Sequence, residues 1–137
     1  MVSIQETKLA LRSVLLDSSL IEECDIAFEG IEFEPGNKSL WLKESILNID
    51  QHNITRCTEN FEGIYILQIF VSKKTPADLI NNFADMLNDI YNPEESYMSF
   101  NGVDVFVHDT ELGNLVTDDK WQFKNFSSYF RSVNREL

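Results

Sequence analysis

The sequence predicts an α+β domain, in which an antiparallel or mixed β-sheet carries two helices packed on it. Three observations support this prediction. Two segments, at residues 3–17 and 75–91, repeat apolar residues at helical spacing. Several other segments alternate apolar and polar residues as strands do, and an Asn-Gly pair at 101–102 marks a tight hairpin. The chain has 137 residues, so we expect a single domain over 1–137.

The first helix is expected over the segment SIQETKLALRSVLLD. Ser3 can cap it, and Glu6, three residues later, completes a capping box. Its apolar stripe consists of Ile4, Leu11, Val14, Leu15 and Leu16. The following segment, residues 24–37, is expected to be extended or irregular and to end in a turn at Pro35-Gly36-Asn37.

Two long strands should follow as a hairpin. The first runs from about Leu40 to Ile49, and its alternation slips by one between Leu42 and Leu47. A bulge would produce that slip, and so would a wrong strand assignment. The second, FEGIYILQIFVSK, is apolar on both faces, so we expect it to be central and covered on both sides. Residues Asp50 to Asn60 between the strands are polar and turn-like.

The second helix is expected over TPADLINNFADMLNDIYNP, with Thr75 as N-cap, Pro76 at the first helical position and Asn92-Pro93 as its end. The remaining segments predict a hairpin around Asn101-Gly102, a polar loop TELGNLVTDD and a last strand KWQFKNFSSYFRSV. The expected element order is therefore α-β-β-α-β-β-β.

Charge limits the class of partner. Lys and Arg total 11 against 23 Asp and Glu, a formal net charge of −12. This balance disfavours nucleic acid and anionic membrane surfaces, and it favours neutral or basic protein partners. Two separated cysteines, Cys24 and Cys57, suit a reduced intracellular setting, although one disulfide is also compatible with the sequence. The N-terminus lacks a signal-peptide pattern, and no apolar run approaches membrane-spanning length.

Reactive residues are few. His108 lies near Asp104, Asp109 and Glu111, which could hold a metal; the ordinary alternative is an exposed strand end with solvated acids.

His52 and Cys57 share one polar loop that offers no rigid support for a nucleophile pair. Three acidic pairs lie in turns or at element ends, where solvated charge is the ordinary reading: Glu22-Glu23, Glu94-Glu95 and Asp118-Asp119. The glycines form no phosphate-binding or nucleophile-elbow motif. We therefore expect no enzyme, no cofactor and no metal.

The polar tip from Asp50 to Asn60 is longer than chain reversal requires, and such loops often carry binding; the alternative is a tolerated surface loop. Some of the ten phenylalanines, or Trp41 or Trp121, could instead lie in a subunit interface.

The order of motifs resembles the tail terminator family of long-tailed bacteriophages, the group that includes the minor tail protein U of phage lambda. The resemblance rests on apolar patterns and runs from the first helix to about Val133. Its most specific parts are Phe33-x-Pro35 leading to Trp41-Leu42, and the strand 64–71 followed by the helix 76–88.

The resemblance implies a virion protein without enzymatic activity, located at the head-tail junction and in the host cytoplasm during assembly. Members form a homohexameric ring on the head-proximal end of the tail tube. They stop tube polymerisation and contact head-completion proteins. By resemblance, the hairpin tip contacts the tube or a neighbouring subunit. The residues assigned to this contact are Asp50, His52, Arg56, Glu59 and Asn60, and Arg56 and Glu59 are its best-placed charges.

Three other interpretations stay open at this point. One is a different head-tail joining protein, such as a neck or tail-completion protein. Another is a small acidic binding module of the immunity or antitoxin type. The third is a hydrolase that uses Asp104, His108 and Asp109.

Overall fold

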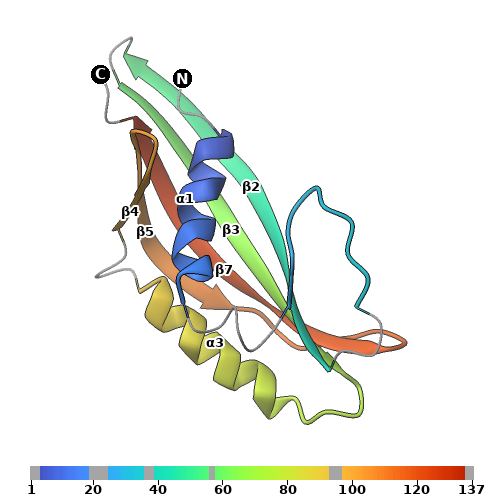
Figure 1. Cartoon of the computed structure of the whole chain (residues 1–137). Coiled ribbons are helices and arrows are strands. Elements are labelled where there is room, and N and C mark those ends of the chain that lie inside the picture. The colour runs from blue at the N-terminus through green and yellow to red at the C-terminus, as the bar shows by residue number, and fades with distance from the viewer. Residues whose placement is uncertain (1–3, 19–24, 36–38, 56–57, 93–96, 135–137) are drawn as a thin grey trace.

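The computed structural model describes residues 4–18, 25–35, 39–55, 58–92 and 97–134, and it has two helices on one face of a twisted sheet (Figure 1). The α+β prediction is therefore confirmed. In chain order the elements are α1 Ile4–Leu16, β1 Asp25–Ala27, β2 Leu40–Thr55, β3 Thr58–Ser72, α3 Asp78–Ile90, β4 Tyr97–Phe100, β5 Val103–Leu112, β6 Val116–Thr117 and β7 Trp121–Asn134.

The seven strands form one mixed sheet in the order β1-β2-β3-β7-β5-β4, with β6 beside β7. Only β1 pairs in parallel, with β2; all the other pairs are antiparallel. Sequence analysis missed the two shortest strands. β1 lies in the segment expected to be extended or irregular, and β6 lies in the expected polar loop, part of which also continues β5 to Leu112.

The β2–β3 hairpin is longer than predicted. Pairing continues from Leu40 opposite Val71 out to Thr55 opposite Thr58, so most of the expected loop at residues 50–60 consists of paired strands. Neither explanation of the slip between Leu42 and Leu47, a bulge or a wrong strand assignment, is correct, because the strand is paired continuously there and its register shifts only at Asn48/Asp50 and Asn53/Thr55. The alternation of apolar and polar residues is interrupted because a charged residue, Glu44, occupies a buried position on the otherwise apolar, helix-facing side of β2.

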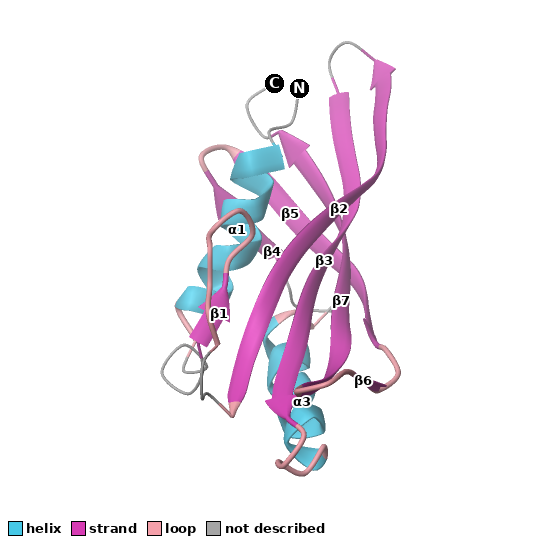
Figure 2. Cartoon of the chain, turned by 90° about the vertical axis from the view of Figure 1, so that its right-hand side faces the viewer, coloured by secondary structure: helices cyan, strands magenta, loops and turns pink. Residues whose placement is uncertain are grey.

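The main core lies between the sheet and the two helices (Figure 2). The central strand β3 contributes Tyr65, Leu67, Ile69 and Val71 to it, all fully buried. The prediction that β3 is covered on both sides is only partly correct. No described helix lies on the opposite face, which we call the open face; there Ile64 and Ile66 are half-buried, and Phe70 joins a separate aromatic cluster.

Helix α1 is attached to its neighbours by polar contacts as well as apolar ones. The hydroxyls of Thr7 on α1 and Ser132 on β7 lie 2.7 Å apart in the core. Tyr91, after α3, donates its hydroxyl to the carbonyl oxygen of Leu11, also at 2.7 Å. A predicted capping box at Ser3 lies outside the described residues.

Helix α3 begins later than predicted. Ala77, not Thr75, stands at its N-cap and makes no side-chain capping bond, whereas the Thr75 hydroxyl lies 2.9 Å from that of Ser72. The predicted end is close to the observed one, since the helix stops at Ile90. The Asn101-Gly102 turn between β4 and β5 is as expected, with both residues at positive φ, which is the geometry a tight hairpin requires.

Gly63 is required by the packing between β2, β3 and β7. A methyl carbon there would lie 2.4 Å from the carbonyl oxygen of Leu47 and 2.8 Å from the ring of Phe130. We predict that Gly63→Ala lowers the free energy of unfolding by about 1–3 kcal/mol, as overpacking does. Gly113→Ala is the control: its methyl meets nothing closer than 3.5 Å. Equal unfolding midpoints of the two variants in urea would contradict this packing.

Candidate functional site

A buried ion pair joins α1 to β2. Glu44 on β2 faces the helices, and Arg12 on α1 donates from Nε to Glu44 Oε2 at 3.0 Å. The side chain of Arg12 is 14% exposed, and that of Glu44 is fully buried, at 0%. Tyr65 on β3 donates its hydroxyl to the same carboxylate, and the backbone N–H of Glu29 donates to its other oxygen at 3.1 Å. Glu44 is thus held by three separate segments.

The contacts decide the protonation state of this cluster. Burial acts to raise the pKa of the Glu44 carboxyl, but hydrogen bonds from Arg12, Tyr65 and the Glu29 backbone outweigh it, so the pKa is lowered. The hydrogen bond to Glu44 raises the pKa of Arg12. Burial raises the pKa of the Tyr65 hydroxyl well above its usual value. At neutral pH the cluster is therefore a carboxylate bound by a guanidinium and a phenol.

Glu29 extends the network to the segment after β1. Its carboxylate accepts the backbone N–H of Ile46 at 3.0 Å and lies 3.5 Å from the ammonium of Lys8. The carboxylate thereby covers a backbone donor at the β2 edge, where β1 has already ended. These contacts hold the segment 28–35 against β2.

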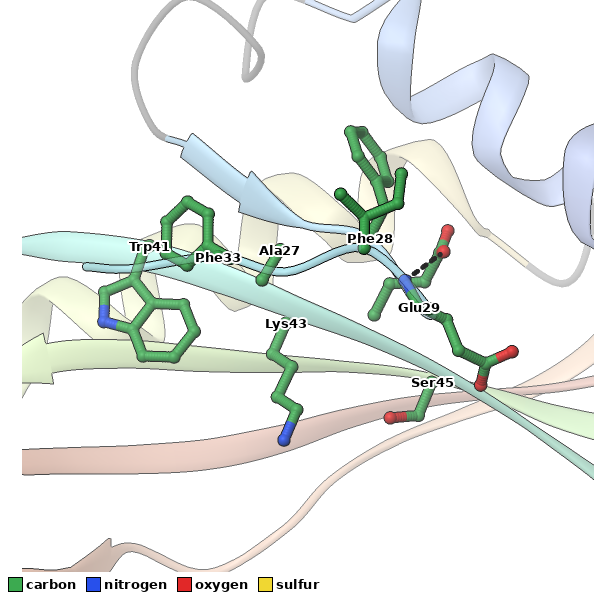
Figure 3. A pocket seen from close by; sticks show the side chains of 10 residues that line it. Ala27, Phe28, Glu29, Phe33, Trp41, Lys43 and Ser45 are labelled. Carbon is green, nitrogen blue, oxygen red and sulfur yellow. Dashed lines mark hydrogen bonds between the residues drawn. The ribbon is translucent and has the colours of Figure 1, made fainter.

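That segment encloses a pocket at the edge of the sheet, which we call the Trp41 pocket (Figure 3). Its volume is about 290 Å³. Its apolar walls include Ala27, Phe33 and Trp41, and its polar residues include Lys43 and Ser45 on β2. Among the described residues Lys43 has no ion-pair partner, whereas the two carboxylates of the lining, Glu29 and Glu44, are both engaged.

Stacked aromatic rings form the wall of the pocket and continue across the open face. The Trp41 ring lies 5.2 Å from that of Phe33 and 4.2 Å from that of Phe70, measured between centroids. Phe70 stacks in turn on Phe123 at 4.6 Å, and Trp121 meets Trp41 edge-on. These rings make the second core cluster, so the wall is rigid.

The predicted binding residues lie on the hairpin. His52 on β2 pairs with Asn60 on β3, and Asp50 pairs with Glu62, so the backbone brings opposite sides of the expected loop together. Glu59 lies on β3 opposite Asn53. The structure does not describe the side chains of residues 48–61, and Arg56 and Cys57 lie wholly outside the described residues.

The other candidate residues do not converge. His108 and Asp109 are exposed beside a bulge in β5, and the Asp104 carboxylate accepts the hydroxyl of Ser99 at 2.7 Å. No three His, Cys, Asp or Glu residues gather as metal ligands in the part of the chain that the structure describes.

Of the acidic pairs, only Asp118-Asp119 is described. The Asp118 carboxylate accepts backbone N–H groups of Trp121 and Lys120, which organise the turn before β7 and lower its pKa.

The arrangement suits binding. An aromatic wall takes an apolar group, and the ammonium of Lys43 takes an anion beside it. Sequence analysis did not assign this pocket or the ion pair. One signal was available: Leu40, Leu42, Glu44 and Ile46 alternate as one row, which places Glu44 inside if the strand is regular.

Comparison with known proteins gives the fold. No family model matches the chain, and no curated protein matches it. Among the solved structures that resemble it is one of a protein whose name states no function. It is 15% identical and covers 96% of each chain, with a TM-score of 0.76. At this identity the likeness shows a shared fold. Within the described residues, no helix is long and apolar enough to span a membrane.

The ion pair can be tested by a double-mutant cycle. We predict that Glu44→Gln lowers the free energy of unfolding by about 3 kcal/mol, because Arg12 is left without its counter-charge. Arg12→Met/Glu44→Gln should lose less than the two single changes together, because each single change leaves one buried charge unpaired and the double change leaves none. Additive losses in urea unfolding would show that the pair is not coupled.

The same variants predict a pH dependence. Because the pKa of Glu44 is lowered in the folded state, its contribution is present above the unfolded value, near 4.5, and is lost as pH falls through the folded value. The unfolding free energy of Glu44→Gln should therefore fall less steeply below pH ~4.5 than that of the native chain. Parallel pH profiles would contradict a lowered pKa.

Proposed function

We propose that this chain is a phage tail terminator: a structural protein that caps the head-proximal end of the tail tube as a ring of six, stops tube polymerisation and presents a surface to head-completion proteins. The resemblance of its motif order suggests this role. The observation that supports it most directly is the shape of the β2–β3 hairpin.

The hairpin extends past the sheet that carries it. Along β3, pairing with β7 stops at Asn60 opposite Val133, while pairing with β2 continues to Thr58 opposite Thr55. The outer end is therefore a two-stranded arm that projects beyond its neighbours (Figures 1 and 2). A polar arm of this kind suits contact with a tube subunit or with the next copy in a ring. Of the residues assigned to this contact, Glu59 lies on the arm. Asp50, His52 and Asn60 lie at its base, where β3 still pairs with β7, and Arg56 lies outside the described residues.

Charge supports the same role. A net charge of −12 opposes unspecific association of subunits in solution. Assembly then depends on specific contacts repeated around a closed cycle. The partners that follow from the proposal are a second copy of the chain, the major tail tube protein and a head-completion protein.

Two alternatives fit some of these features. A neck or tail-completion protein would also be acidic, small and located at the head-tail junction, but it would bind assembled heads or connectors and leave tube length unchanged. An immunity or antitoxin module would bind one toxin or enzyme in a fixed ratio. Tail-tube and connector genes found beside this one would favour a virion role over the second alternative.

Arg56, which the resemblance assigns to the contact, provides the test. We predict that Arg56→Glu abolishes capping, because the reversal changes the charge that the resemblance assigns to the contact. The measurement is the length of tubes polymerised from the cognate tail tube protein, with and without each variant. Native protein should stop elongation and Arg56→Glu should not, at unchanged thermal unfolding.

Lys74→Glu is the matched control, since Lys74 is an exposed lysine in the turn after β3, outside the arm. It should cap as the native chain does. Full capping by Arg56→Glu would remove this residue from the contact, and unlimited tube growth with the native chain would refute the proposed function.

A further inference from the structure

Two exposed features lie on opposite edges of the sheet. One is the Trp41 pocket on the β1–β2 side. The other, which we call the β5–β6 rim, comprises residues 111–116, where β5 ends and β6 begins. On the rim Leu115 is 43% and Val116 47% exposed, and Glu111 is exposed beside them.

The strand register places the pocket and the rim at the same level along the strand direction. Trp41 is opposite Phe70, Phe70 opposite Phe123, and Phe123 opposite Val116. Four residues further along β2, a second row crosses the sheet from Ser45 through Ile66 and Ser127 to Glu111 on β5. Residues directly opposite in a sheet point to the same face. Pocket and rim therefore share the open face and the same rows.

This geometry is what head-to-tail repetition requires. A cyclic ring is built from two different patches that meet around an axis, and a difference in height between them would produce a helix instead. If the symmetry axis of the ring runs parallel to the strands, the rim of one copy meets the pocket of the next copy without any shift along that axis. The pocket edge is also free of sheet pairing beyond Lys43, where β1 ends.

Size and charge agree with this pairing. An apolar cavity of about 150 Å³ accepts a benzene ring, and the Trp41 pocket measures about 290 Å³, so it has room for a leucine side chain. Lys43 is the cation of the pocket, and Glu111 is the exposed carboxylate of the rim. Glu111 also accepts the Tyr129 hydroxyl at 3.1 Å, which orients it on the open face.

We propose that the β5–β6 rim of one copy inserts Leu115 into the Trp41 pocket of the next copy, with Glu111 pairing to Lys43. The ring itself rests on the proposed function, and this contact specifies its subunit interface. The buried Glu44–Arg12 pair has a positioning role in it, because Glu44 and Glu29 hold the segment that encloses the pocket.

Substitutions at equally exposed leucines test the apolar part. Leu115 and Leu16 are both 43% exposed, and Leu16 ends α1 on the helix side of the sheet. Leu115→Asp should weaken ring formation at least about tenfold, because it would bury an unpaired carboxylate against aromatic rings. Leu16→Asp should leave it unchanged. The measurement is native mass across a concentration series, without and with tube ends present.

A charge exchange tests the polar part. Lys43→Glu and Glu111→Lys should each weaken the ring by about fivefold or more, and the double reversal should restore it. Restoration distinguishes a direct contact from a folding defect, which two damaging changes would not repair. Lys43→Arg should retain the ring.

The outcomes separate the two proposals. If the native chain forms a ring that Leu115→Asp and both charge reversals leave intact, this interface is wrong and the terminator role stands. If the native chain forms no ring, either alone or on tube ends, the terminator role fails and the interface fails with it. Loss with Leu115→Asp and restoration by the charge exchange would support both.

Discussion

The buried pair of Glu44 and Arg12 is the interaction on which the arrangement of this domain depends. It links the first helix to the second strand through a carboxylate that is fully buried and also holds Tyr65 and the backbone of Glu29. A buried ion pair adds little net stability, since the cost of removing both charges from water offsets their attraction. Its effect here is positional: helix, strand and edge segment fit together in the one way that satisfies the buried carboxylate.

The consequences extend along the edge of the sheet. Glu29, placed by Glu44, covers the N–H of Ile46, so the β2 edge is protected where β1 stops. The segment that follows then closes over Trp41 and forms a pocket with a rigid aromatic wall. A strongly acidic subunit thereby carries one apolar, locally basic recess at one edge and an apolar, acidic rim at the other. Such a distribution suits ordered self-assembly.

The sequence predicts those elements whose signal is local. The apolar spacing of residues 79–91 and the Asn101-Gly102 turn need no distant partner to be recognised, and both are found. The extent of the hairpin was missed because a strand is recognised in a sequence by alternating apolar residues. Residues 50–55 and 58–60 are mostly polar, yet they belong to the paired strands β2 and β3. The strand β1 has three residues and is stabilised by pairing with β2, fifteen or so residues later, which no local pattern reveals. The pocket depends on that pairing and on Glu44, whose partner Arg12 is thirty-two positions away.

The most direct test of the whole account is the mass and shape of the native assembly. Negative-stain images of the chain on the ends of tubes made from the cognate tail tube protein, with native masses of the same samples, would decide it. The account predicts a closed ring of six copies at one end of each tube, with the sheets standing side by side around the axis. Bare tube ends together with a monomer at every concentration would contradict it.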